Sequence, residues 1–273
     1  MCTRILYETG TGTYVTGRSM DWNDLQMDTY CWIFPRVMKR DGGVGADSIT
    51  WTSKYGSLIF SAYNLVTSDG VNEAEMAGNL LYLAEADYGD AKTSGKPTIS
   101  VGALLQYLLD NYGSVAEAVE GIRSDPVTVI AANAPNGRPV SVHFSLSDAT
   151  GDSAVLEYIG GKLQIHHDRE YRVMTNSPIY DQQLAINAYW DLIGGKNFLP
   201  GTISAADRFV RASYALKSSP RFKDRRAAVA AVLSQMRSIG VPPGRAIPTS
   251  LTSRRRCGEP LSTTMQNVTT STP

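Results

Sequence analysis

The side chain with the most chemical potential in this sequence is the thiol of Cys2, the second residue. A small residue at this position permits removal of the initiator methionine, which leaves a thiol and a free α-amine on one residue. An α-amine has a reference pKa of about 8 and can act as a base near neutral pH, and a thiolate is a strong nucleophile. Cys2 could therefore supply both nucleophile and base, without a catalytic histidine. Taken alone, however, a cysteine at position 2 is more often a chance occurrence.

Two charged residues, Arg18 and Asp21, follow at a spacing that could bring them close to Cys2. The segments on either side of Gly10-Thr11-Gly12 have β-strand composition, and this turn favours a hairpin. In such a hairpin the end of the second strand lies beside the start of the first, so Arg18 would lie near the thiol and favour its thiolate form. The Asp21 carboxylate could orient the α-amine. The alternative is a surface ion pair of little energetic value.

Two further motifs could carry chemistry but are better explained as structure. Gly151-Asp152-Ser153 is similar to a lipase-like motif, yet it falls in a predicted hairpin turn. His166 and His167 could bind a metal, but adjacent residues on a strand point to opposite faces of the sheet. We therefore expect a turn and two structural histidines.

The composition argues against several classes of partner. The chain has 273 residues, 42% of them hydrophobic and 19% charged, as in a globular domain with a sizeable core. Lys+Arg and Asp+Glu number 26 each, so no basic surface for nucleic acid is indicated. Three cysteines do not suggest a disulfide framework, and no apolar run is long enough to span a membrane. Because no signal peptide is visible, we expect a cytoplasmic protein, or a periplasmic one if a leader was omitted.

The order of the expected elements indicates an α+β fold. We expect strands at residues 4–7, 13–18, 30–35, 49–52, 57–62, 127–131, 140–147, 153–159, 162–166 and 171–175. We expect helices at residues 99–111, from 114 onward, and at 181–193, 205–216 and 224–238. This order suits two stacked, mostly antiparallel sheets faced by helices. We expect one domain over residues 1–252, followed by an atypical tail at 253–273 whose Ser- and Thr-rich composition predicts disorder.

Five blocks of sequence resemble the choloylglycine hydrolase family, which includes bile salt hydrolases and penicillin V acylases. The blocks are Met1–Arg4, Gly17–Trp22, Asp69–Glu73, Thr175–Pro178 and Asp207–Arg211. They occur in order between Cys2 and about Gly244, and the similarity is greatest to the Gram-negative branch. The resemblance implies the N-terminal nucleophile hydrolase fold, a four-layer αββα sandwich that is commonly a homotetramer. It implies no metal and no cofactor.

The resemblance also implies a role for each of six residues, namely Cys2, Arg18, Asp21, Tyr82, Asn176 and Arg208. Cys2 would be the nucleophile, Asp21 would hold its α-amine, and Arg18 would lie beside the thiol. The side chain of Asn176 and the backbone N–H of Tyr82 would donate hydrogen bonds to the tetrahedral oxyanion. Each donor would stabilise the transition state by about 3 kcal/mol. Arg208 matches the remaining catalytic-site arginine.

Three of these residues also have structural interpretations. Asn176-Ser177-Pro178 could be a turn that opens a helix. Arg208 could be a solvated helix residue that follows an N-cap at Ser204. Tyr82 could simply belong to the core.

The sequence departs from the family pattern at two places. Glu75 stands where the family usually has glycine, so its backbone could be strained by a positive φ. The second departure follows Ser253, where family members continue with a Thr-x-Trp-Arg-Thr-Val-type strand. Codons for residues 254–262, read from the third base of each codon, permit a run that contains Thr-Val-Trp-Arg-Thr-Val. We therefore predict a frameshift just before residue 254 that would remove C-terminal strands; the alternative is a divergent or disordered tail.

The activity implied by the resemblance is hydrolysis of a linear non-peptide amide through a thioester. Candidate substrates are glycine- or taurine-conjugated bile acids and penicillin V, with N-acyl homoserine lactones as an alternative. A ceramidase- or peptidase-type hydrolase with the same machinery, and an inactive truncated family member, also stay open. Met20, Trp22, Trp32 and Tyr82 could line an apolar acyl pocket or could be core.

Overall fold

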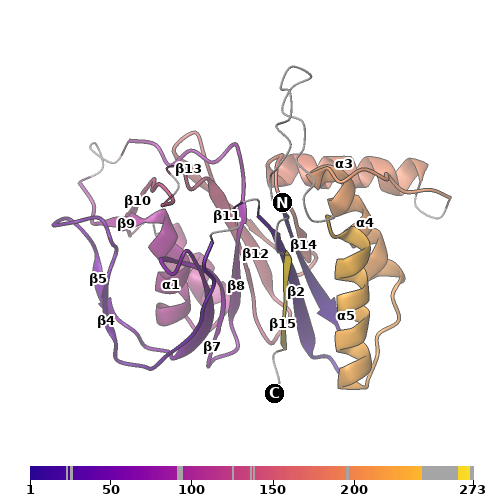
Figure 1. Ribbon diagram of the computed structural model, residues 1–273, viewed down its shortest axis with the longest axis horizontal. Helices are drawn as coiled ribbons and strands as arrows, with labels where there is room; N and C mark the ends of the chain where they lie inside the picture. The colour runs from indigo at the N-terminus through magenta and orange to yellow at the C-terminus, as the bar shows by residue number, and fades with distance from the viewer. Residues whose placement is uncertain are drawn as a thin grey trace.

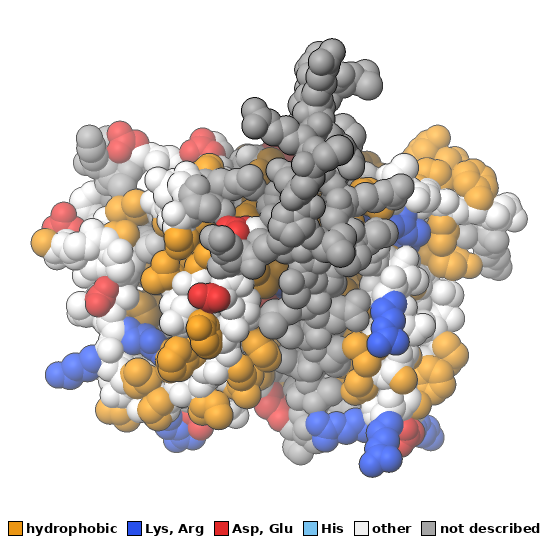
Figure 2. Space-filling model, viewed as in Figure 1, with side chains coloured by type: hydrophobic (Ala, Val, Ile, Leu, Met, Phe, Trp, Pro, Cys, Tyr) orange, Lys and Arg blue, Asp and Glu red, His pale blue; other side chains and the backbone are white. Residues whose placement is uncertain are grey.

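The computed structural model describes most of the chain. It covers residues 1–241, with gaps at 23, 25–26, 91–94, 125, 136, 138 and 195–196, and the backbone of residues 264–270. On the face shown in Figure 2, both acidic and basic side chains of the described residues are visible, in keeping with the equal numbers of 26 each in the sequence. No helix in the described ranges is long and apolar enough to cross a membrane.

A four-stranded antiparallel sheet carries the N-terminus (Figure 1). Its strands, in spatial order, are β14 (Val173–Met174), β1 (Cys2–Glu8), β2 (Tyr14–Asp21) and β15 (Thr264–Thr270). The β1–β2 hairpin has its turn at Thr9–Thr13, where the side chains of Thr9 and Thr13 are hydrogen-bonded at 2.7 Å. The hairpin predicted from the sequence is therefore confirmed.

The second large sheet has seven antiparallel strands. In spatial order they are β13 (Lys162–His167), β12 (Ser153–Ile159), β11 (Val142–Ser147), β8 (Ala77–Tyr82), β7 (Val66–Asn72), β6 (Ser57–Ala62) and β3 (Cys31–Phe34). Two small pairs lie apart from it, an antiparallel pair of β4 (Lys39–Asp41) with β5 (Thr50–Thr52) and a parallel pair of β9 (Thr98–Ser100) with β10 (Thr128–Ile130).

Helices cover the outer faces of both sheets, so the layers run helix, sheet, sheet, helix (Figure 1). On the seven-stranded sheet lie α1 (Val101–Asn111) and α2 (Val115–Arg123). On the four-stranded sheet lie α3 (Tyr180–Ile193), α4 (Ala205–Ser218) and α5 (Arg225–Ile239). This is the predicted αββα arrangement. The N-cap expected at Ser114 is also present, since its hydroxyl accepts the N–H of Glu117 at 3.2 Å.

Because the four-stranded sheet lies between helices and the other sheet, both of its faces are buried. Alternate residues of β1 therefore serve different layers. Arg4 reaches Ser153 of the seven-stranded sheet, whereas the Thr3 hydroxyl accepts a hydrogen bond from α4. Gly17 of β2 faces α5, where an added Cβ would lie 2.6 Å from Val232. A glycine is therefore needed for the close approach of this helix.

The structure contains elements that the sequence did not predict. Strands β7 and β8 were not expected, because buried polar residues such as Thr67, Ser68 and Asp69 hide the hydrophobic pattern of β7. Residues 264–270, for which composition predicted disorder, form a strand along β2. The other tail residues of the predicted 253–273 segment lie outside the described ranges.

Candidate active site

Cys2 begins strand β1 and is buried between the two large sheets. It pairs with Met20 of β2, and Arg4 pairs with Arg18, so these four side chains share the sheet face that Arg4 turns toward the seven-stranded sheet. The Arg18 Nη2 atom lies 4.0 Å from Cys2 Sγ. The neighbourhood predicted for Cys2 and Arg18 is therefore present.

Met1 extends the β1–β2 pairing by one residue. Its carbonyl accepts the N–H of Asp21 at 2.6 Å, and its amine donates to the Asp21 carbonyl. The Cys2 nitrogen is an amide in this full-length chain and stands in for the α-amine that removal of Met1 would expose. Removal would also take away the contacts that Met1 makes with the backbone of Asp21.

Arg18 is held by a buried carboxylate. Its Nε lies 3.0 Å from Oδ1 of Asp69, and its Nη2 donates to the Leu80 carbonyl at 2.8 Å. Asp69 itself accepts a hydrogen bond from Asn79 at 2.9 Å and contacts the Ser68 hydroxyl. These contacts fix the direction of the Arg18 guanidinium. Asp69 therefore determines where the guanidinium lies relative to the thiol.

Asn176 follows β14 and reaches the nucleophile from the side. Its Oδ1 accepts the Cys2 N–H at 2.7 Å and an Arg208 Nη2–H at 2.9 Å. Its Nδ2 donates to the Tyr82 carbonyl at 2.7 Å. Two donors on one side and an acceptor on the other fix the direction of the amide. An amide nitrogen carries two hydrogens, so Asn176 can donate to Tyr82 and to a substrate oxyanion together.

The backbone N–H of Tyr82 points toward the same side as Asn176. Tyr82 stands opposite Val142 of β11, and the next pair in register is joined by the Leu83 N–H to Ser141 at 3.0 Å. Hydrogen-bonded and non-hydrogen-bonded pairs alternate along an antiparallel ladder, so both backbone groups of Tyr82 face away from β11. Its carbonyl is the group that accepts from Asn176, and its N–H is therefore available on that side.

Arg208 enters from α4, on the opposite face of β1. It is fully buried and donates to the Cys2 carbonyl, the Thr3 hydroxyl and Asn176. Burial lowers the pKa of Arg208 to about 10, against the opposing effect of the charges of Cys2 and Asp21. Arg208 is thus not the solvated helix residue of the alternative interpretation; it fixes the main chain of the nucleophile and the amide of Asn176.

Cys2 opens onto a pocket of about 380 Å³, a volume typical of small-molecule sites. The walls are mostly apolar and include Met20, Trp22, Met27, Leu65, Leu80 and Tyr82. The rings of Trp22 and Tyr82 are 6.3 Å apart and tilted by 50°. A larger hollow of about 530 Å³ shares Leu65 but has Trp32 and Phe34 in place of Cys2 among its lining residues. Of the four apolar residues predicted to line the pocket, Met20, Trp22 and Tyr82 do so, and the prediction for Trp32 is wrong.

Comparison with known proteins agrees with this geometry. Residues 2–253 match the family described as linear amide C–N hydrolases, choloylglycine hydrolase family. The chain belongs to this family. It is an N-terminal cysteine amidohydrolase with the N-terminal nucleophile hydrolase fold.

The relatives of this choloylglycine hydrolase family member include acylases and bile salt hydrolases. A penicillin V acylase of Pectobacterium atrosepticum is 45% identical over 268 residues, covering 90% of this chain and 71% of the relative. A bile salt hydrolase/transferase of Clostridium perfringens is 29% identical over 242 residues, covering 78% of this chain and 71% of the relative. The solved penicillin V acylase from Agrobacterium tumefaciens is 44% identical, with a TM-score of 0.86 over 98% of this chain and 79% of that chain.

The structure brings together five of the six predicted site residues through direct contacts: Cys2, Arg18, Tyr82, Asn176 and Arg208. The sixth, Asp21, has buried carboxylate oxygens one residue beyond the partner of Cys2, and its charge acts on Arg208.

Sequence reasoning assigned no role to Asp69 or to Gln183, which both hold parts of this family member's site. Asp69 lies in a block that carries the family resemblance, and that block was the signal that could have found it. Gln183 donates to the carbonyls of Asn176 and Pro178 from α3. The position of Gln183 in the sequence gives no signal of this role.

Proposed function

We propose that the mature chain, starting at Cys2, hydrolyses the side-chain amide of penicillin V, with conjugated bile acids as the second candidate substrate. The observation that carries the proposal is the position of Cys2, whose thiol faces an apolar pocket while its nitrogen contacts Asn176. Flat apolar walls, including Trp22 and Tyr82, suit an aromatic acyl group. The 45% identity to a penicillin V acylase favours this substrate, and the 29% identity to a bile salt hydrolase keeps the second.

The proposed reaction begins with transfer of the Cys2 thiol proton to the α-amine. The thiolate then attacks the amide carbonyl, and the oxyanion accepts hydrogen bonds from Asn176 Nδ2 and the Tyr82 N–H. As the carbon–nitrogen bond breaks, the ammonium of Cys2 returns a proton to the leaving amine, and a thioester remains. The α-amine next takes a proton from water, which attacks the thioester and releases the carboxylic acid and the thiol.

The other site residues have supporting roles in this scheme. Arg18 stabilises negative charge on sulfur from 4.0 Å. Asp21 holds the α-amine, and Arg208 keeps the nucleophile's main chain and Asn176 in place. None of these steps requires a metal or a cofactor.

The test is a substrate panel of penicillin V, glycocholate and an N-acyl homoserine lactone. We expect hydrolysis of penicillin V by the wild type, at least 1,000-fold lower kcat for Cys2→Ala, and unchanged kcat for Cys31→Ser, whose cysteine is exposed. Mass spectrometry of the active protein should show that Met1 is absent. Active protein that retains Met1, or full turnover by Cys2→Ala, would refute the mechanism. Preference for glycocholate would reverse the order of the two substrates.

We further propose a homotetramer and a cytoplasmic location. Several large apolar side chains of the described residues are exposed, including Ile33 and, beside one hollow, Trp32 and Leu65, which suits burial between subunits. Light scattering of the purified protein should give four chains per particle. Fractionation of the native host should place the protein in the cytoplasm, and recovery from the periplasm would contradict that location.

We also propose that the gene is out of frame after codon 253. The family match ends at residue 253, where the sequence changes character. Resequencing should show a single insertion or deletion at this point, followed by a reading frame that encodes Thr-x-Trp-Arg-Thr-Val. An intact frame through Pro273, without such a continuation, would refute the proposal.

A further inference from the structure

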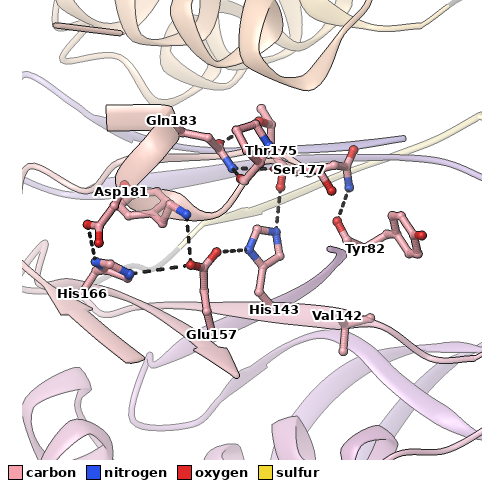
Figure 3. A network of polar contacts seen from close by, with 12 residues as sticks. Tyr82, Val142, His143, Glu157, His166, Thr175, Ser177, Asp181 and Gln183 are labelled. Atoms are coloured by element: carbon pink, nitrogen blue, oxygen red, sulfur yellow. Dashed lines mark hydrogen bonds and ion pairs between the residues drawn. The ribbon is translucent and has the colours of Figure 1, made fainter. Parts of the chain in front are cut away.

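The seven-stranded sheet contains a buried pair, His143 and Glu157, directly behind the loop that carries Asn176 (Figure 3). His143 lies on β11 and Glu157 on β12, and neither has exposed surface. The His143 Nδ1 atom is 2.8 Å from Glu157 Oε1, and its Nε2 atom is 2.8 Å from the carbonyl of Thr175. The pair is not part of the pocket, so its contact with Thr175 is its link to the site.

The direction of this contact follows from the chemistry of a carbonyl. A carbonyl oxygen can only accept, so the Nε2 atom of His143 must carry a proton. This holds whether His143 is an imidazolium beside a carboxylate or a neutral imidazole beside a carboxylic acid. In either state the imidazole ring donates to Thr175, and its contact with Glu157 prevents a ring flip.

Glu157 is itself fixed from several directions. Its Oε2 accepts the N–H of Tyr180 at 3.0 Å, at the start of α3, and lies 3.7 Å from His166. His166 in turn lies 3.4 Å from the largely exposed Asp181 (Figure 3). Burial raises the pKa of Glu157, but the hydrogen bond from His143 and the nearby His166 outweigh burial and lower it to about 2. The carboxylate is therefore ionised and immobile at neutral pH.

The carbonyl that His143 holds belongs to the peptide bond between Thr175 and Asn176. Gln183 holds the next carbonyl along, that of Asn176, from the opposite layer. The backbone of Asn176 is thus fixed on both sides, by β11 and by α3. The orientation of this peptide sets the position from which the Asn176 side chain reaches the oxyanion.

We propose that His143, oriented by Glu157, is a positioning residue for the oxyanion donor Asn176. This inference rests on the role given to Asn176 in the proposed function. His143 touches neither substrate nor nucleophile. It acts by holding the Thr175 carbonyl, and its loss should raise the barrier of the chemical step without weakening substrate binding.

The experiment compares two variants that both lack the buried charge. In Glu157→Gln the new amide can donate to Nδ1 of a neutral His143 and accept from Tyr180, so the donation to Thr175 persists. The second variant, His143→Leu/Glu157→Gln, keeps the same residue at position 157 and removes the imidazole whose Nε2 atom donates to Thr175. We expect kcat for penicillin V to be about 100-fold lower in the double variant than in Glu157→Gln, as for a catalytic group displaced by about 1 Å. KM should change less than about threefold, because neither residue lines the pocket and the contacts between substrate and pocket walls stay the same.

Alkylation of Cys2 by iodoacetamide, followed by mass spectrometry at Cys2, separates positioning from collapse of the site. Alkylation needs the thiolate but forms no oxyanion, so its rate should be equal in the two variants. His167→Gln is the matched control, because His167 forms a similar pair with Asp152 at 2.8 Å near a hairpin turn. It should keep wild-type kcat. If the double variant does not fold, Glu157→Leu takes its place and should show at least a tenfold lower kcat than Glu157→Gln.

Each outcome decides between the two proposals. Equal kcat in the two variants, or a loss confined to KM, would overturn the role of His143. So would alkylation of Cys2 that is slower in the double variant than in Glu157→Gln by the same factor as kcat. Retention of kcat by Asn176→Ala would overturn the role of Asn176 itself, and with it this inference. Loss of kcat in Asn176→Ala without loss in the His143 variant would overturn this inference alone. A wild type that hydrolyses neither penicillin V nor glycocholate would overturn both.

Discussion

Replacement of Arg208 by methionine tests how far the site depends on one buried cation. Arg208 donates to the Cys2 carbonyl, the Thr3 hydroxyl and the Oδ1 atom of Asn176, and its Nε donates to the Ile203 carbonyl at 3.0 Å. Methionine fills a similar volume without a donor. The variant therefore leaves the packing of α4 on β1 largely intact and removes the hydrogen bonds.

The expected effect on catalysis is large because Asn176 loses one of the two donors that hold its Oδ1 atom. With the Cys2 nitrogen as the only donor left to Oδ1, the amide is held less firmly beside Tyr82 and can rotate away from the oxyanion. Loss of one oxyanion donor lowers kcat by about 100- to 1,000-fold, and we expect about 100-fold because the donor is displaced rather than deleted. KM should stay within about threefold, since Arg208 is not among the pocket-lining residues.

The effect on stability should be smaller than the number of lost hydrogen bonds suggests. Each buried acceptor left without a donor costs about 1–3 kcal/mol. Against this, the variant no longer buries a cation whose pKa is lowered by burial to about 10. We therefore expect the free energy of unfolding to fall by about 1–3 kcal/mol, measured by urea unfolding.

The matched control is Arg211→Met, one helical turn further along α4. Arg211 donates to the carbonyls of Pro200 and Thr202, outside the site. It should keep wild-type kcat for penicillin V. The reasoning fails if Arg208→Met retains kcat within about threefold of wild type while folding normally, or if both variants lose the same activity.

Three further changes have expected outcomes that are simple to measure. Glu75 has a φ of 66°, so Glu75→Gly should raise the free energy of unfolding by about 0.5–1 kcal/mol in urea unfolding; a decrease would contradict the strain. The lowered pKa of Glu157 stabilises the fold above its unfolded-state value of 4.5, and this contribution is lost as pH falls toward about 2. The stability advantage of wild type over Glu157→Gln should therefore shrink by about 2 kcal/mol between pH 6 and pH 3, and a constant difference would refute it. A chain ending at Ser253 leaves β2 without its β15 partner, so its thermal midpoint should fall by several degrees, and an unchanged midpoint would show that β15 adds no stability.

The parts of the site that are local in sequence could be predicted from the residues alone. Cys2 and Arg18 are 16 residues apart and share a hairpin, so strand composition and turn chemistry placed them together. Period-two alternation then puts their side chains on one face. The positive φ of Glu75, by contrast, was predicted through the family resemblance, because Glu75 stands where the family usually has glycine.

The distant parts of the site could be predicted only through the family resemblance. Asn176 and Arg208 are 174 and 206 residues from Cys2, and no local pattern links positions so far apart. Their residue types were also compatible with a turn and a solvated helix. Only the packing of α4 and of the β14 loop on β1 decides between these interpretations.

Buried polar residues escaped prediction for a different reason. His143, Glu157 and Asp69 lie on strands whose sequences look ordinary or too polar for the core. Each is satisfied by a partner on another strand, as when Arg18 pairs with Asp69 across the two sheets. Desolvation is tolerated only because the partner is present. A single sequence does not reveal such pairings, because neither partner is unusual until the sheets are stacked.

Asn176 is the point where the layers of the fold meet. Its side chain is bound by β1, α4 and β8, its own carbonyl by α3, and the preceding carbonyl by β11 through His143. The nucleophile, by contrast, lies on the β1–β2 hairpin, and apart from Asn176 only Arg208 holds its main chain from another layer among the hydrogen bonds of the described residues. A small shift between layers therefore moves the oxyanion donor relative to the thiol before it disturbs the thiol itself. For this reason, substitutions that alter the contact between layers should lower kcat while Cys2 keeps its reactivity toward an alkylating agent.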